Sequence, residues 1–288
     1  MIMKTYTKSP NSNMFTEIWL SPLMFLIISF GGTTAVALDP MGPPAANMEH
    51  GQFSIGADFS HSNTDLELTN GVWTENLDGA FYDWGEAVDL TLKDFKVDRG
   101  YVRLGYGITD NCETFLRVGG SRAEFGDSIW EDSEKFDSRA EPSLGLGVKA
   151  TFYDGGNFTF GGLFQANWAG FDGKLNASHW AAPDFVEVDM TEVQIAAGMT
   201  VMLSDRVSIY GGPFAHFIDG ELKDTFSAID SGTGGLLTSQ YQWDIEENSS
   251  FGGYLGTRME LTENCSLNIE IQHTSAADAF GAGIVWRF

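Results

Sequence analysis

The feature that most restricts the fold is an alternation of apolar residues that continues from Gly51 to the end of the chain. In runs of about ten residues every second residue is apolar, and the residues between are mostly glycine, small or polar. Clear examples are Val102, Leu104, Tyr106 and Ile108; Leu144, Leu146, Val148, Ala150 and Phe152; and Val193, Ile195, Ala197, Met199, Val201 and Leu203. Since successive side chains of a strand point to opposite faces, these runs predict β-strands with one apolar and one polar face.

The connections between the runs alternate in length. Those at 109–112, 153–157, 203–206 and 262–265 are tight, whereas those at 63–95, 125–138, 172–185 and 220–239 are longer, acidic and rich in glycine. We count about ten strands, with eight as the alternative, and short turns facing long loops are typical of a membrane barrel. The predicted fold class is therefore all-β, a closed antiparallel up-and-down transmembrane β-barrel over residues 51–288.

The last residues, GAGIVWRF, still alternate where the chain stops. Because a bilayer interior cannot hydrogen-bond an open sheet edge, we expect the last strand to pair with the first and close the cylinder. Trp286 and Phe288 then lie in an aromatic girdle at the lipid interface. The alternative is a soluble β-sandwich, periplasmic or secreted, which also alternates but needs neither an apolar aromatic terminus nor regularly alternating connections.

The first residues have the composition of a targeting segment. Lys4 and Lys8 precede the apolar stretch IWLSPLMFLIISF, and AVA at 35–37 provides small residues for cleavage. We therefore expect a Sec-type signal peptide over 1–37 and, because residues 38–50 are rich in proline and lack periodicity, a short periplasmic linker over 38–50.

The charge is strongly acidic. The net charge of −24 becomes −25 when residues 1–37, with two lysines and one glutamate, are removed. This repels nucleic acid and favours cationic or divalent-metal contacts. The acidic stretches 77–89 and 130–137 offer oxygen ligands for Ca²⁺ or Mg²⁺ and for bridges to lipopolysaccharide phosphates, but neither has the spacing of a Ca²⁺ loop, so we expect no cofactor.

The AFGAGIVWRF ending, the ITDN-type turns and the targeting segment resemble the small porin-like and OmpA-like barrels of the bacterial outer membrane. The resemblance covers essentially all of 51–288 as a pattern. It implies a barrel in the outer membrane of a Gram-negative bacterium, surrounded by lipid and lipopolysaccharide. It also implies that the terminal Phe288 is an assembly signal for the barrel-assembly machinery.

If the apolar face contacts lipid, a set of charged residues faces the lumen. It comprises Arg103, Arg117, Lys149, Glu192, Arg258, Glu260 and Glu270. Across the turn at 262–265, Arg258 and Glu270 are predicted to lie opposite each other as an ion pair. The functional interpretation is a constriction that selects solutes by charge, and the alternative is a structural plug that fills the cylinder.

Two short motifs suggest enzymes. His273 and Ser275, with Asp278 following, resemble the His-x-Ser of outer-membrane lipid A deacylases. His216 and Asp219, with Asp83 and Glu86, can be compared with omptin proteases, but the Asp-x-Asp and Asp-x-His spacings are absent. Cys112 and Cys265 belong to turns of different hairpins, so a disulfide is not expected.

The sequence thus predicts a non-enzymatic, porin-like barrel that forms a narrow or gated passage for small polar solutes. The alternative is a closed barrel whose acidic loops contact lipopolysaccharide or other envelope partners. An envelope lipid or peptide hydrolase is the remote third interpretation.

Overall fold

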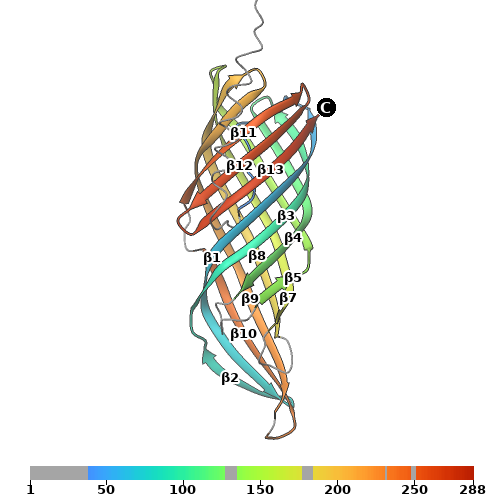
Figure 1. Ribbon diagram of the computed structural model, residues 1–288, viewed down its shortest axis with the longest axis vertical. Coiled ribbons are helices and arrows are strands. Elements are labelled where there is room, and N and C mark those ends of the chain that lie inside the picture. The colour runs from blue at the N-terminus through green and yellow to red at the C-terminus, as the bar shows by residue number, and fades with distance from the viewer. Residues whose placement is uncertain (1–37, 127–134, 177–183, 231, 248–250) are drawn as a thin grey trace, which may run out of the picture. The chain divides into compact units, whose positions relative to one another are not determined.

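Antiparallel strands form a single closed sheet in the computed structural model, which describes residues 38–126, 135–176, 184–230, 232–247 and 251–288 (Figure 1). The predicted signal peptide and most of the acidic stretch 130–137 lie outside these residues. The strands are β1 (Phe53–Leu77), β2 (Ala80–Glu86), β3 (Leu90–Thr109), β4 (Cys112–Gly126), β5 (Lys135–Ser138), β6 (Glu141–Asp154), β7 (Phe158–Asn176), β8 (Asp184–Ser204), β9 (Val207–Ile229), β10 (Leu236–Glu247), β11 (Phe251–Thr262), β12 (Cys265–Thr274) and β13 (Ala277–Arg287). Within the described residues no helix is long and apolar enough to cross a bilayer.

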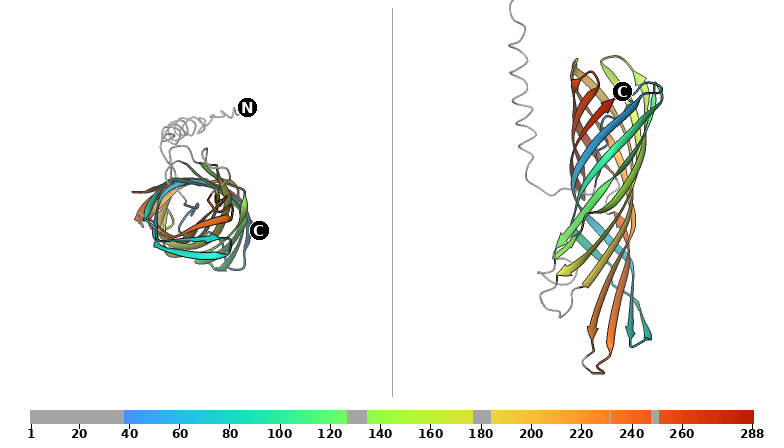
Figure 2. Two further views of the ribbon diagram at one scale, coloured as in Figure 1. Left: turned by 90° about the horizontal axis from the view of Figure 1, so that it is seen from below. Right: turned by 90° about the vertical axis from the view of Figure 1, so that its right-hand side faces the viewer.

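The last strand closes the ring, as predicted. β13 pairs with β1 from Ser54↔Arg287 to Thr64↔Ala277, while the other edge of β1 pairs with β3. The backbones of Phe53 and Phe288 exchange two hydrogen bonds of 3.1 and 3.0 Å. The end-on view in Figure 2 shows the resulting ring. Trp286 and Phe288 are both exposed on its outside.

The ring contains ten strands at one end and eight at the other. At the end with the short turns, which we call the turn end, the ring consists of β1, β3, β4, β6, β7, β8, β9, β11, β12 and β13. The β12–β13 hairpin stops part-way along the wall, and beyond it β10 pairs directly with β1, from Leu66↔Glu247 onward. At this loop end β5 takes the place of β6, which leaves eight strands. The prediction of about ten strands is therefore confirmed for the turn end.

The predicted long loops at 63–95 and 220–239 are mostly strand. β1 continues to Leu77, β9 continues to Ile229, and β2 adds a hairpin to β1. These residues were expected to be loops because their apolar residues no longer follow the alternation of the turn end. They follow an alternation of the opposite sense, in which the apolar side chains point inward.

Strand β8 shows this reversal without any interruption of its pairing to β7. Near the turn end Glu192 and Gln194 are buried inside and Ile195 is exposed outside, whereas toward the loop end Val188 is buried and Asp189 is exposed. Buried apolar residues of this inner cluster come from every strand of the eight-stranded end: Leu66, Leu68, Leu92, Phe95, Val97, Ala123, Phe125, Phe136, Ala169, Phe171, Leu175, Val186, Val188, Met190, Ile218, Leu222, Trp243 and Ile245. We call the two parts the polar-interior half and the apolar-interior half.

The outside of the polar-interior half is the lipid-facing surface. Its exposed residues include the members of the predicted runs, among them Val102, Leu104, Leu144, Leu146, Ile195, Met199, Phe280 and Ile284. A continuous apolar exterior around a polar interior is the arrangement that a bilayer requires of a barrel. This confirms which face of these runs is turned outward.

Residues 38–48 lie inside the barrel, whereas a short periplasmic linker was predicted over 38–50. Leu38, Asp39 and Met41 are completely buried, and the segment is visible within the ring in the end-on view of Figure 2. Its prolines and alanines prevent strand periodicity, but they also make a narrow extended chain. Such a chain fits the lumen because wall side chains can hydrogen-bond its backbone.

Candidate functional site

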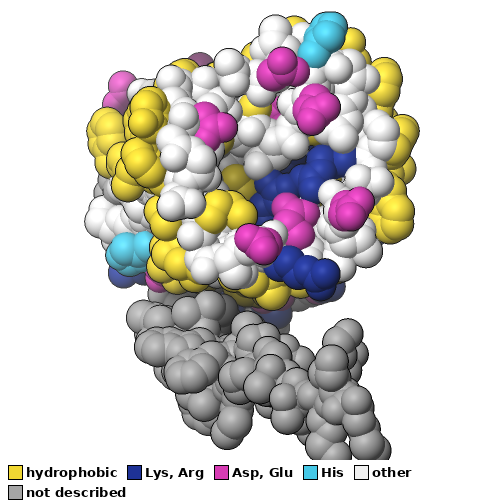
Figure 3. Space-filling model, turned by 90° about the horizontal axis from the view of Figure 1, so that it is seen from above, with side chains coloured by type: hydrophobic (Ala, Val, Ile, Leu, Met, Phe, Trp, Pro, Cys, Tyr) yellow, Lys and Arg dark blue, Asp and Glu magenta, His cyan; other side chains and the backbone are white. Residues whose placement is uncertain are grey.

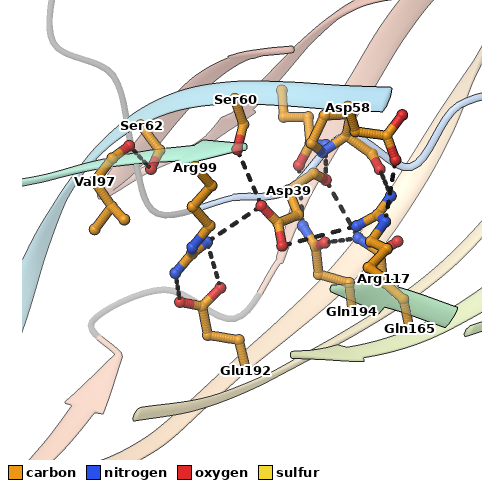
Figure 4. A network of polar contacts seen from close by, with 12 residues as sticks. Asp39, Asp58, Ser60, Ser62, Val97, Arg99, Arg117, Gln165, Glu192 and Gln194 are labelled. Carbon is orange, nitrogen blue, oxygen red and sulfur yellow. Dashed lines mark hydrogen bonds and ion pairs between the residues drawn. The ribbon is translucent and has the colours of Figure 1, made fainter. Parts of the chain in front are cut away.

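The centre of the polar-interior half is organised around the carboxylate of Asp39 (Figure 4). Ser60 Oγ, on β1, donates a hydrogen bond of 3.0 Å to Asp39 Oδ1, and Arg99 Nη1, on β3, lies 3.4 Å from the same oxygen. Arg117 Nη1, on β4, lies 3.7 Å from Asp39 Oδ2. All four side chains are buried, so the ion pairs are shielded from solvent.

Each of the two arginines also has an acidic partner on the barrel wall. Arg99 binds Glu192 through both of its terminal nitrogens, one of them at 3.0 Å. Arg117 Nε lies 3.3 Å from Asp58 Oδ2. Because buried charges persist only when they are paired, these wall carboxylates hold the two guanidinium groups in place beside Asp39.

The rest of the inner segment is bound through its backbone. Glu270 accepts hydrogen bonds from the amides of Met41 and Gly42, at 3.0 and 2.8 Å. Lys149 Nζ donates to the carbonyl of Pro43 at 2.8 Å, and Arg117 donates to the carbonyl of Pro40. The wall therefore recognises the segment at consecutive peptide groups, which fixes its register.

The carbonyl of Asp39 itself is held by glutamine side chains. Gln272 Nε2 donates to it at 2.7 Å, and Gln165 Nε2 donates at 3.3 Å. Gln194 links the two amides, since it contacts Gln165 and donates to Gln272 at 3.0 Å. Asp39 is therefore bound at both its carboxylate and its carbonyl.

Closer to the turn end the lumen opens into a vestibule with basic walls. Arg103 lies 3.4 Å from Glu113, and Arg258 and Arg287 share Glu260 at 2.6 and 2.9 Å. Figure 3 shows lysine and arginine side chains gathered in the hollow at this end. The three arginines outnumber the two carboxylates that they contact.

The predicted ion pair between Arg258 and Glu270 does not form. Arg258 is opposite Asn268 and Glu270 is opposite Gly256, so the actual register differs by two residues from the predicted one. A bulge between Glu260 and Thr262 accounts for one residue of this difference, because it adds one residue to one strand of the hairpin.

Asp39 completes the charge balance of this interior. Among the described residues, the walls of the polar-interior half contribute six cations, Arg99, Arg103, Arg117, Lys149, Arg258 and Arg287, and five carboxylates, Asp58, Glu113, Glu192, Glu260 and Glu270. Asp39 is the sixth carboxylate, with His216 counted as neutral. Without Asp39 the wall carries one uncompensated positive charge.

Little space is left around the deeper part of the segment. Beside it lie two small cavities of about 30 and 10 Å³, and the larger one is lined by Arg103, Lys149 and Arg258. Such volumes hold one or two water molecules. A cavity of about 250 Å³ lies beside Ala46 and Asn47 at the turn end. In the apolar-interior half, the rings of Phe125 and Phe136 stack at 4.5 Å and fill the cylinder with the rest of the inner cluster.

The structure places all seven predicted lumen charges on the inner side of the wall. It adds five that the sequence prediction missed: Arg99, Glu113, Asp58, Arg287 and Asp39. Arg99 and Glu113 are odd-numbered like their inward neighbours Arg103 and Arg117, Asp58 is even-numbered like the inward Ser60, and Arg287 is odd-numbered like the inward Gly283, so the alternation contained the signal for these four. Asp39 had no such signal, because it lies in a segment without periodicity.

The enzyme-like motifs lie apart from this centre. His273 contacts Asp278 on the outside of the wall, and Ser275 lies in the turn between β12 and β13. His216 is inside the barrel, 3.9 Å from Glu192, and not at the outer rim. In the described part of the chain no three His, Cys, Asp or Glu side chains are grouped to hold a metal ion, and both cysteines are free.

Solved structures of outer-membrane barrels are similar to this chain at low identity. They include OprG of Pseudomonas aeruginosa (12% identity, 84% of this chain and 98% of that chain, TM-score 0.42) and the toluene transporter TbuX of Ralstonia pickettii (12%, 89% and 95%, 0.40). The protease OmpT of Escherichia coli is another (12%, 82% and 97%, 0.38). Because every TM-score is below 0.5, no function is transferred from them.

No curated relative is similar enough in sequence to match this chain. A family model does match: the outer membrane protein beta-barrel domain covers residues 96–288, which is most of the closed sheet. Taken with the lipid-facing exterior and the ring closed by its last strand, this match shows that the chain belongs to the outer membrane protein β-barrel domain family.

Proposed function

We propose that this protein is a closed, non-enzymatic outer-membrane barrel whose loop end contacts partners in the cell envelope. The supporting observation is that both halves of the interior are filled. Residues 38–48 occupy the polar-interior half, and a packed apolar cluster occupies the other half. A solute would have to displace both to cross, so the lumen charges act as a plug.

The exterior of the apolar-interior half supports the contact function. Several of its outward residues are acidic and adjacent across strands: Asp189 pairs with Glu221, and Glu221 with Asp244. Lys223 contacts Glu221 at the edge of this group. Asp219 and Glu246 form the next pair toward the lipid-facing surface. Carboxylates at this level suit divalent cations that bridge to lipopolysaccharide phosphates.

A gated passage for small polar solutes is the second candidate. The observation in its favour is that the plug is one continuous segment held by polar contacts, which water can replace. Predicted removal of residues 1–37 would leave this segment as a chain end. Release would then open the polar-interior half, although the apolar cluster would still have to rearrange.

Single-channel conductance tests the closed interior. The chain 38–288 and a chain 50–288 that lacks the segment are refolded, and heat-modifiable gel migration confirms folding of each. We expect neither to conduct. Stable steps from 50–288 alone would establish the gated passage, and steps from 38–288 would refute the closed interior.

The contact function has a separate test. Asp189→Asn, Glu221→Gln and Asp244→Asn are combined, and lipopolysaccharide bound per barrel is measured with Mg²⁺ and with EDTA. We expect the triple variant to lose most of the Mg²⁺-dependent binding. A matched triple change of Asp83, Glu86 and Asp89 in the β2 region is the control. Equal binding by the parent and the first variant would contradict the proposal.

A further inference from the structure

We propose that Arg99, Arg117 and Ser60 form a binding site for a small four-carbon dicarboxylate, which Asp39 occupies as a built-in ligand. Two guanidinium groups and one hydroxyl from three neighbouring strands converge on a single carboxylate. All of these side chains are buried. Such convergence of arginines is how proteins bind free carboxylates.

Asp39 fills this site imperfectly. Asp39 Oδ2 and the Arg117 nitrogens Nε and Nη1 are buried without a hydrogen bond, and the Asp39–Arg117 ion pair is 3.7 Å long. The position of the Asp39 carboxylate is limited by the backbone, which other wall residues hold at the carbonyls of Asp39 and Pro40 and at the amides of Met41 and Gly42. A free carboxylate has no such restraint and can approach Arg117 at hydrogen-bond distance.

The excess charge of the wall selects an anion. When the inner segment leaves, six wall cations face five wall carboxylates, and the missing charge is at the position of Asp39. A neutral solute would leave the arginines uncompensated in a buried site, which is costly. The basic vestibule at the turn end lies on the route by which an anion would arrive (Figure 3).

The length of the ligand follows from the second set of donors. Gln272 and Gln165 bind the carbonyl oxygen of Asp39, while the arginines bind its carboxylate. In aspartate the carboxyl carbon and the carbonyl carbon are separated by two carbons, which is the skeleton of succinate. The site therefore binds two oxygen groups at a 1,4 spacing. One is a carboxylate between the arginines, and the other is a neutral carboxylic acid beside the glutamine amides and Glu270, because the wall has an excess of only one positive charge.

The consequence is a binding cup and not a channel. The apolar cluster still closes the loop end after the segment leaves, so the ligand enters and departs at the turn end. The inference goes beyond the proposed function and does not rest on it, since a barrel that conducts no ions can still bind a solute. Ligand and segment exclude each other, so the ligand favours the released segment.

Cysteine accessibility measures this competition in the folded chain 38–288. Ala45→Cys is placed in the segment of a Cys112→Ser, Cys265→Ser background, where residue 45 is 3% exposed. We expect succinate to raise the rate of maleimide labelling at least threefold, with saturation, whereas the neutral isostere succinamide has no effect. Glutarate, one carbon longer, and acetate should act only at much higher concentration.

Calorimetry on Asp39→Asn provides the second readout. This change removes the competing charge but keeps the shape of the segment, so succinate should bind at least tenfold more tightly than to the parent. Adding Ser60→Ala should then weaken binding. If succinate neither alters labelling of the parent nor binds folded Asp39→Asn, or if acetate and phosphate act as well as succinate, the dicarboxylate site is refuted.

Discussion

Replacing an outward valine by arginine should have very different effects in the two halves of the barrel. Val148 is the central member of the outward run Leu144, Leu146, Val148, Ala150 and Phe152 on β6. Its neighbours across the sheet are Thr114 and Phe164. Val72, on β1 in the apolar-interior half, also points outward, beside Gln242 and Glu86. The two valines are similarly exposed, at 37% and 44%.

The expected costs follow from what surrounds each side chain. At Val148 the arginine would lie near the middle of the hydrocarbon, where the penalty is about 2–4 kcal/mol, or about 30- to 700-fold in the folding equilibrium. At Val72 it would lie in water beside a carboxylate, and we expect a change within about 0.5 kcal/mol. The contrast tests the boundary between the two halves as well as the direction of the side chains.

Urea unfolding from phospholipid bilayers, followed by tryptophan fluorescence, gives both free energies of unfolding. Val148→Ala and Val72→Ala are the controls for loss of the valine itself. If Val148→Arg costs no more than Val72→Arg, the outer face of β6 does not contact hydrocarbon and the assignment of the lipid-facing surface is refuted. If both cost about 2–4 kcal/mol, the apolar-interior half is also in the bilayer.

Two further predictions concern packing and assembly. Phe171→Ala should destabilise the barrel by about 3–5 kcal/mol, because the ring is fully buried against Phe95. Phe160 is partly exposed to lipid, so Phe160→Ala should cost clearly less in the same unfolding assay. Equal costs would contradict the packed apolar interior. Phe288→Ser should reduce the amount of barrel assembled in cells while changing the free energy of unfolding of purified, refolded protein little, since the backbone bonds to Phe53 do not need the ring. A loss of stability equal to the loss of assembly would mean that Phe288 is structural only.

The alternation predicted the fold because it records a physical requirement at every second residue. Val102 and Leu146 must be apolar where they meet lipid, and Arg103 and Lys149 are tolerated only because they point the other way. The pairing register was less accessible, since Arg258 lies opposite Asn268 and not Glu270 although both side chains point inward as predicted. Whether a residue is even- or odd-numbered along a strand shows which face it is on, but not which residue lies opposite it on the next strand.

The candidate site shows a different limit. Its wall residues, such as Arg99 and Arg117, follow the alternation, but Asp39 belongs to a segment whose order comes entirely from what surrounds it. No local pattern distinguishes a proline-rich linker in water from one threaded through a lumen. The indication was indirect: the predicted lumen charges did not have enough opposite partners among themselves, and Asp39 contributes the one that balances the wall.

Along β8 the apolar residues change from even-numbered to odd-numbered positions, and the place of this change indicates where the membrane begins. In Phe185–Leu203 the apolar set changes from even to odd numbers between Met190 and Val193, although the strand and its pairing to β7 continue unbroken. The backbone has not changed direction there, so the environment has: the outside is water before the change and hydrocarbon after it. The same change occurs on β3, where Val97 points inward and Val102 outward. A switch of parity within a regular strand therefore marks the membrane boundary, and it lets one sheet be built like a soluble barrel at one end and like a membrane barrel at the other.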